Sequence, residues 1–260
     1  MCAAGPLLIA SESASDVHGG SGLGRAVLPE PVAFPSRTPA AAAIVAAAKA
    51  HPGGVDLVAT GPLTNIAAAM ILEPDLPRLL KSFTLMGGAF TIAGNVTPAA
   101  EFNIWHDPEA ARYVVRHFAR EDVPLPVAVG LDATHQARLS EAEVEALAAR
   151  MDVAPNGKAL ANFLRDCTAH YFDFMQERIG RRVLTLHDPL AVAAAIDPSL
   201  LTCSPFAVDV ETEGKFARGL TLADRRERAT PARATLAVAL GVDAERFRHD
   251  FTSALERLAC

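Results

Sequence analysis

Two amides and a carboxylate lie close together in the segment GNVTPAAEFNIWHDPEAA, residues 94–111. They are Asn95, Glu101 and Asn103, and they follow an apolar, strand-like run. Amides supply donors and acceptors and a carboxylate supplies acceptors, so this set suits the vicinal hydroxyls of a sugar. A phosphate would instead call for Arg, Lys or a helix N-terminus. In the alternative interpretation, Asn95 caps a turn, Asn103 caps a helix and Glu101 is solvated.

A histidine and an aspartate stand together in TLHDPLAVAAAID, residues 185–197, where His187 and Asp188 open a strongly apolar helix. One interpretation makes Asp188 only the N-cap, with Pro189 at the first helical position. In the other interpretation, the two residues act as an acid and a metal ligand at the N-terminus of the helix. The local pattern leaves both interpretations open.

The glycine-rich segment DVHGGSGLG, residues 16–24, fits neither of two known loop motifs. No apolar strand precedes it and its spacing does not match G-x-G-x-x-G, so a dinucleotide-binding loop is excluded. Leu23 stands where a G-x-S-x-G nucleophile elbow needs its last glycine. The segment therefore predicts a loop that carries His18.

Strand-like and helical patterns alternate along the chain and must position these side chains. The predicted helix caps are Thr38, Asp107, Asp243 and the capping box of Ser140 with Glu143. We expect strands at 55–60, 82–88, 125–132, 206–212, 218–224 and 234–240, and helices at 38–50, 63–72, 107–118, 140–151, 156–180, 186–197 and 243–258. This order predicts an α/β fold, a mainly parallel sheet with helices on both faces, in a single domain over residues 1–260. Ligands should bind beyond the carboxyl ends of the strands.

Composition excludes several functional classes. The net charge is −6, with 24 basic and 30 acidic residues, so no nucleic-acid partner is expected. Four cysteines without a C-x-x-C pair argue against a zinc site and a disulfide framework, which favours a reducing cytoplasm. No apolar run reaches the length of a membrane span, and the first residues lack the pattern of a secretory signal.

Four segments together resemble the inosine–uridine-preferring nucleoside hydrolase family, in the same order and over nearly the whole chain. They are DVHGGSGLG, LVATGPLTNIA, LMGGAFTIAGNVTPAAEFNIWHDPEAA and LHDPLAVAAAIDP. The resemblance implies a Rossmann-like core and calcium-dependent hydrolysis of the N-glycosidic bond of ribonucleosides to free base and ribose. It also implies a homodimer or homotetramer. Base preference, whether purine, pyrimidine or mixed, stays open.

The resemblance also implies roles for individual residues. Asn95, Glu101 and Asn103 would hold the ribose hydroxyls, and Met86 would line the sugar site. Asp188 and the backbone carbonyl of Thr60 would bind calcium. His187 would stand near the leaving base as a general acid, and His18 and Tyr171 would lie on the base side.

The chain departs from the family at its start, where no D-x-D-P-G-x-D-D motif is found and the first acidic residues are Glu12 and Asp16. We therefore expect the first βα units to be missing and the calcium site to be short of oxygens, since calcium takes about 6–8 ligands. Three explanations are a truncated sequence, an inactive fragment, and a pseudoenzyme that still binds the nucleoside or its ribose. The buried-helix patterns at 63–72 and 190–197 favour truncation, because such helices need a complete sheet to cover. An unrelated doubly wound enzyme is disfavoured, because no phosphate loop or Ser elbow is present.

Overall fold

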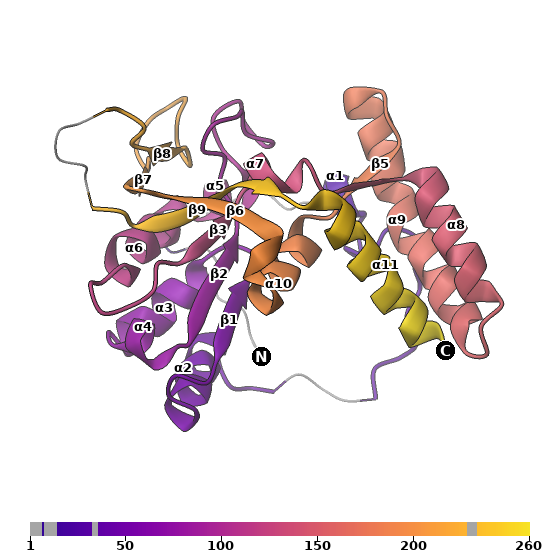
Figure 1. Cartoon of the computed structure of the whole chain (residues 1–260), viewed down its shortest axis with the longest axis horizontal. Coiled ribbons are helices and arrows are strands. Elements are labelled where there is room, and N and C mark those ends of the chain that lie inside the picture. The colour runs from indigo at the N-terminus through magenta and orange to yellow at the C-terminus, as the bar shows by residue number, and fades with distance from the viewer. Residues whose placement is uncertain (1–6, 8–14, 33–35, 228–232) are drawn as a thin grey trace. The chain divides into compact units, whose positions relative to one another are not determined.

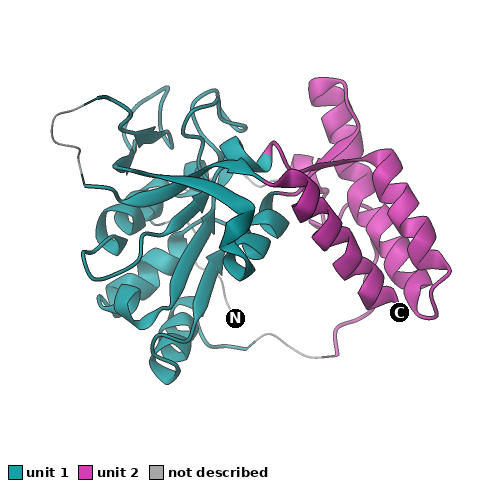
Figure 2. Cartoon of the chain, in the orientation of Figure 1, with its two compact units in different colours: residues 1–11, 34–134, 187–242 teal, residues 12–33, 135–186, 243–260 magenta. Residues whose placement is uncertain are grey.

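A computed structural model describes residues 7, 15–32, 36–227 and 233–260. The chain divides into two compact units (Figure 2). Unit 1 comprises residues 1–11, 34–134 and 187–242, and unit 2 comprises residues 12–33, 135–186 and 243–260. The single domain over residues 1–260 stays a prediction.

Unit 1 is built on a five-stranded sheet in the order β1-β2-β3-β9-β6 (Figure 1). The strands are β1 (Asp56–Ala59), β2 (Ser82–Met86), β3 (Val127–Val129), β9 (Leu236–Val242) and β6 (Leu201–Phe206). The first four run parallel and β6 pairs antiparallel with β9. A mainly parallel sheet is thus confirmed. The edge strand β6 was not expected from the sequence.

Helices cover both faces of this sheet, with α3, α4 and α6 on one side and α10 on the other (Figure 1). The helical elements of unit 1 are α2 (Ala40–Ala50), α3 (Thr64–Leu72), α4 (Leu76–Leu79), α5 (Phe102–His106), α6 (Pro108–Phe118), α7 (Leu131–Thr134), α10 (His187–Ile196) and the 3-10 turn η1 (Pro198–Leu200). Two further strands, β7 (Val208–Val210) and β8 (Thr221–Ala223), form a separate two-stranded sheet among the described residues.

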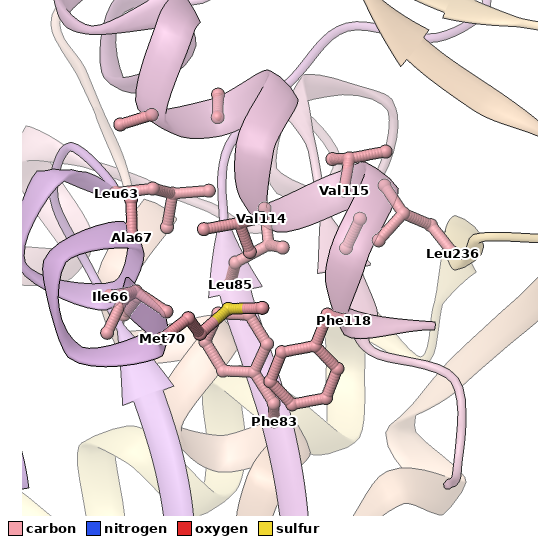
Figure 3. Close-up of a cluster of buried hydrophobic side chains, with 14 of the residues drawn as sticks. Leu63, Ile66, Ala67, Met70, Phe83, Leu85, Val114, Val115, Phe118 and Leu236 are labelled. Carbon is pink, nitrogen blue, oxygen red and sulfur yellow. The ribbon is translucent and has the colours of Figure 1, made fainter. Parts of the chain in front are cut away.

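The core of unit 1 lies between α3, α6 and the sheet. Ile66 and Met70 of α3 face Phe83 of β2 and Phe118 of α6 (Figure 3). The Phe83 and Phe118 rings stack with their centroids 4.8 Å apart. Each buried phenylalanine contributes about 1.5–3 kcal/mol relative to an exposed one. This packing fixes the positions of β2 and α6, which flank the polar segment 94–107.

Helix caps show where local sequence signals suffice and where they do not. Asp107 caps α6 as predicted, since its carboxylate accepts from Ala110 N at 3.1 Å. The capping box of Ser140 with Glu143 and the Asp243 cap are also confirmed. Thr38 as a cap is wrong, because α2 begins at Ala40 after Pro39 and no side chain bonds the helix start.

Unit 2 is mainly helical. It contains α1 (Ser15–His18), α8 (Glu141–Asp152), α9 (Gly157–Ile179) and α11 (Ala244–Ala259), with a two-stranded antiparallel sheet of β4 (Arg138–Ser140) and β5 (Val183–Thr185). Leu147 and Met151 of α8, Ala161 of α9 and Ala259 of α11 form its small core. No helix within the described part of the chain has the length and apolar character needed to cross a membrane.

Candidate functional site

The predicted ligand-binding residues of unit 1 gather where its parallel strands end. Thr60 follows the last residue of β1, Met86 is the last residue of β2, and α7 follows β3. Because β1, β2 and β3 are parallel neighbours, their carboxyl ends meet at one edge of the sheet. The residues predicted to bind a ligand therefore lie at the edge of the sheet where the sequence predicts binding; that they bind one stays a prediction.

Glu101 is the buried centre of the site, with an exposed fraction of 2%. It is the N-cap of α5, and its Oε1 accepts from Asn103 N at 2.9 Å. Its Oε2 accepts from Gly88 N at 3.0 Å and from Ile104 N at 3.1 Å. The interpretation of Glu101 as a solvated residue is therefore wrong: backbone donors hold the carboxylate in place.

The two predicted amides flank Glu101 in different ways. Asn103 lies inside α5 rather than at its cap, and its Nδ2 donates to the Met86 carbonyl at 3.1 Å. Asn95 accepts through Oδ1 from Phe102 N at 3.0 Å, which closes the turn ahead of α5. Met86, Asn95, Glu101 and Asn103 are thus brought together around the start of α5. Asn95 fits the turn-capping interpretation as well.

The loop after β2 is held by residues that the sequence interpretation missed. Asp132 of α7 accepts from Phe90 N and Thr91 N, both at 2.8 Å, and from the Thr91 hydroxyl. Thr221 Oγ1 accepts from Ala89 N at 3.1 Å. The only available signal was an aspartate at the end of the strand predicted over 125–132, and its partners lie more than forty positions earlier.

A glycine is required within this loop. Gly88 has φ +91°, a conformation that side chains rarely adopt, and a Cβ there would lie 2.6 Å from Phe90 Cζ. Gly130 approaches the same ring, with a Cβ position 2.8 Å from Phe90 Cε2. The Phe90 ring therefore packs directly on the backbones of Gly88 and Gly130. This packing fixes the direction of the Gly88 N–H group that donates to Glu101.

Asp188 and Glu101 are two carboxylic acids whose pKa values are both raised, mainly by desolvation. Desolvation raises the pKa of Glu101, and the negative charge of Asp188 raises it further. Asp188 is exposed, yet the protein packed on one side of its carboxyl group removes part of its water and raises its pKa to about 6. α10 begins at His187, so Asp188 lies in the first turn and the N-cap interpretation is wrong.

Replacing Asp188 with asparagine is expected to stabilise the fold at neutral pH. The pKa is raised from 3.8 to about 6 on folding, so the folded state binds this proton more tightly than the unfolded state. Protonation therefore favours folding, and stability falls as the pH rises from about 4 through 6. The Asp188→Asn variant should have a higher free energy of unfolding than wild type at pH 7 and a similar one at pH 4, measured by urea titration.

Asp56 provides the matched control for this experiment. Hydrogen bonds from Lys81 and Ser82 lower the pKa of its carboxyl, which is the opposite direction. Asp56→Asn should therefore bring no gain at pH 7. A gain for Asp188→Asn that is as large at pH 4 as at pH 7 would contradict the assignment.

His187 lies next to Asp188 at the start of α10 and is half-buried. Its Nδ1 is 2.8 Å from the hydroxyl oxygen of Thr134, the last residue of α7. Thr134 is fully buried. The sequence interpretation named His187 and not Thr134.

His18 and Tyr171, predicted for the base side, both belong to unit 2. Their rings stack with centroids 6.2 Å apart and an interplanar angle of 23°. Desolvation lowers the pKa of His18, as does nearby His170, and desolvation raises the pKa of Tyr171. His18 ends the short helix α1, and its carbonyl accepts from Gly24 N at 2.9 Å, so the glycine-rich segment is a closed turn.

The donors for calcium do not form a complete set. Calcium takes about 6–8 oxygen ligands, and the predicted ligands are the Asp188 carboxylate and the Thr60 carbonyl. The Glu101 oxygens already accept three backbone N–H groups. Among the residues that the structure describes, no group of three or more His, Cys, Asp or Glu side chains is arranged to hold a metal ion. These residues alone do not fit a calcium ion.

Comparisons with known proteins point in one direction. The family model described as inosine-uridine preferring nucleoside hydrolase matches residues 2–249. The pyrimidine-specific ribonucleoside hydrolase RihA of Enterobacter sp. (strain 638) is 37% identical over 216 residues, covering 81% of this chain and 64% of the relative. The probable uridine nucleosidase 2 of Arabidopsis thaliana is 38% identical over 206 residues, covering 79% and 60%.

Solved structures agree with this result. The purine-preferring ribonucleoside hydrolase from Gardnerella vaginalis superimposes with a TM-score of 0.86 at 32% identity, covering 98% of this chain and 78% of that one. The plant nucleoside hydrolase PpNRh1 gives 0.80 at 31% identity, covering 95% and 75%. The fold is therefore that of a nucleoside hydrolase. The chain spans 64% of the length of the curated Enterobacter relative and 60% of the Arabidopsis relative.

Proposed function

We propose that this chain, which belongs to the inosine-uridine preferring nucleoside hydrolase family, binds ribonucleosides and hydrolyses their N-glycosidic bond to free base and ribose. The observation that carries the proposal is the buried carboxylate of Glu101, which accepts from three backbone N–H groups, one in the loop after β2 and two in α5. A buried, oriented carboxylate beside an amide side chain is a recognition group for hydroxyls rather than a structural ion pair.

The residues around α5 offer the acceptors and donors that a ribose diol needs. A carboxylate has about four lone-pair sites, of which Glu101 uses three on backbone donors, so one remains for a sugar hydroxyl. Asn103 uses Nδ2 on the Met86 carbonyl, and its Oδ1 accepts no hydrogen bond from the described residues. We assign ribose binding to Asn95, Glu101 and Asn103, with Met86 lining the sugar face.

The carboxylates of Glu101 and Asp188 suit the chemistry of N-glycosidic cleavage. Breaking this bond develops positive charge on the sugar in an oxocarbenium-like transition state. Glu101 and Asp188 place negative charge where that cation forms, and His187 at the start of α10 supplies a donor for the leaving base. Asp188 and the Thr60 carbonyl are the two donors that we propose for calcium. Because they do not complete a site, no step is derived through the metal.

A second function is favoured by a specific observation. The Glu101 carboxylate that we propose for ribose binding is held by backbone donors, whereas no group of three or more His, Cys, Asp or Glu side chains among the described residues is arranged to hold a metal ion. A nucleoside- or ribose-binding protein without hydrolytic activity would have this combination.

The relatives' names specify both pyrimidine and purine nucleosides, so the proposal includes no base preference.

The test is release of reducing sugar from inosine, uridine, cytidine and adenosine, with calcium and with a chelator. If the chain hydrolyses nucleosides, ribose is released in the presence of calcium and the chelator abolishes that release. Nucleoside binding without release would support the second function instead. Neither binding nor release would overturn both.

A further inference from the structure

We propose that Thr134 is a positioning residue that fixes the neutral His187 ring in the tautomer with its proton on Nε2. The inference rests on the proposed function, in which His187 donates to the leaving base. It concerns a contact between the last residue of α7 and the first residue of α10, both in unit 1. The hydroxyl oxygen of Thr134 lies 2.8 Å from His187 Nδ1.

The direction of this hydrogen bond follows from the surroundings of Thr134. The residue is fully buried, and its backbone N–H donates to the Gly130 carbonyl at 3.0 Å. Within the described residues, His187 Nδ1 is the only hydrogen-bond partner of the Thr134 hydroxyl. If that hydroxyl only accepted from Nδ1–H, its own O–H would be buried without an acceptor, at a cost of about 1–3 kcal/mol.

Thr134 therefore donates and Nδ1 accepts. In a neutral imidazole one nitrogen carries the proton and the other accepts, so the His187 proton resides on Nε2, at the opposite edge of the ring. A departing base gains electron density on its nitrogen as the bond to the sugar breaks. Nε2–H can donate a hydrogen bond to that nitrogen, whereas the other tautomer would present a lone pair and repel it.

Thr134 is itself held in place by the loop that binds Glu101. α7 is anchored through Leu131 N, which donates to the Gly88 carbonyl at 2.8 Å, and through Asp132, which accepts from Phe90 N and Thr91 N. Gly88 also donates to Glu101. One buried turn of helix thus connects the ribose-binding carboxylate to the orientation of His187, as outer-shell partners orient ligating histidines in metal sites.

The direct test is nitrogen-15 NMR of the His187 ring at a pH where it is neutral. The chain has eight histidines, so loss of a signal in His187→Gln assigns the resonance. We expect the wild-type ring to be protonated on Nε2, with Nδ1 shifted as for a hydrogen-bond acceptor. Thr134→Val should abolish that Nδ1 shift, and Thr134→Ser should retain it. Thr252→Val is the matched control, because that hydroxyl bonds the Arg248 carbonyl in its own helix.

A wild-type ring protonated on Nδ1, or an Nδ1 resonance unchanged in Thr134→Val, would overturn the proposal. The wild-type spectrum alone shows which ring nitrogen of His187 carries the proton, even if Thr134→Val does not fold. In an active preparation, Thr134→Val should lower turnover of inosine and spare p-nitrophenyl riboside, whose leaving group needs no donor. If the wild-type chain hydrolyses neither substrate, the proposed hydrolysis is wrong. The NMR spectrum of the His187 ring still tests the tautomer in that case.

Discussion

Replacing Glu101 with glutamine is expected to weaken ribose binding about 10- to 100-fold, since hydrogen bonds to charged groups contribute about 1.5–3 kcal/mol and 1.4 kcal/mol corresponds to tenfold. The amide removes the negative charge and places an NH₂ group against backbone donors, because both carboxylate oxygens accept N–H groups in the wild type. Binding of methyl β-D-ribofuranoside, which presents the ribose diol without a base, can be measured by ligand-observed NMR.

Glu73 is the control for this substitution. It is a carboxylate of the same unit that pairs with Lys49 at the surface, and Glu73→Gln should leave the affinity unchanged. Circular dichroism and a urea titration separate loss of binding from loss of fold. An unchanged affinity in a folded Glu101→Gln protein would remove Glu101 from the site.

Replacing Asp132 with alanine is expected to lower the free energy of unfolding by about 2–4 kcal/mol, since each buried donor left without its acceptor costs about 1–3 kcal/mol. The substitution removes the acceptor of Phe90 N and Thr91 N, and the Phe90 environment is buried. Because Gly88 in the same loop bonds Glu101, affinity for the riboside should fall as well. Urea titration measures the first effect and NMR the second.

Asp122→Ala is the matched comparison for Asp132→Ala. Asp122 is an exposed carboxylate paired with Arg78, and such surface pairs contribute about 0–1 kcal/mol. An Asp132→Ala protein as stable as Asp122→Ala would mean that the loop after β2 does not depend on the carboxylate of α7.

Most elements of the fold follow from local patterns. The buried runs that became β1, β2, β3 and β9 are short, apolar and bounded by turn residues, and Asp107 marks the start of α6 through its own side chain. β6 was missed because LTCSPF has no alternation and contains Pro205. Proline is tolerated on an edge strand, and β6 is at the edge of the sheet. Its pairing with β9 is a tertiary effect.

The residue types of the candidate site stand out in the sequence, whereas the contacts that hold these residues in place do not. Asn95, Glu101 and Asn103 stand out in the sequence because three polar groups follow a strand. Whether Glu101 is solvated or buried depends on Gly88, thirteen positions earlier, and local spacing cannot reveal that contact. The same holds for Asp132 and for Thr134, whose partner His187 lies 53 residues away.

The most direct test of the central claim, recognition of a ribose diol by the Glu101 group, compares methyl β-D-ribofuranoside with its 2-deoxy analogue. Ligand-observed NMR gives both affinities for the wild-type chain. Loss of one hydroxyl from a site built to bond it leaves a buried partner unsatisfied, so we expect the 2-deoxy compound to bind at least about tenfold more weakly. Equal affinities would contradict the claim that Glu101, Asn95 and Asn103 recognise the diol.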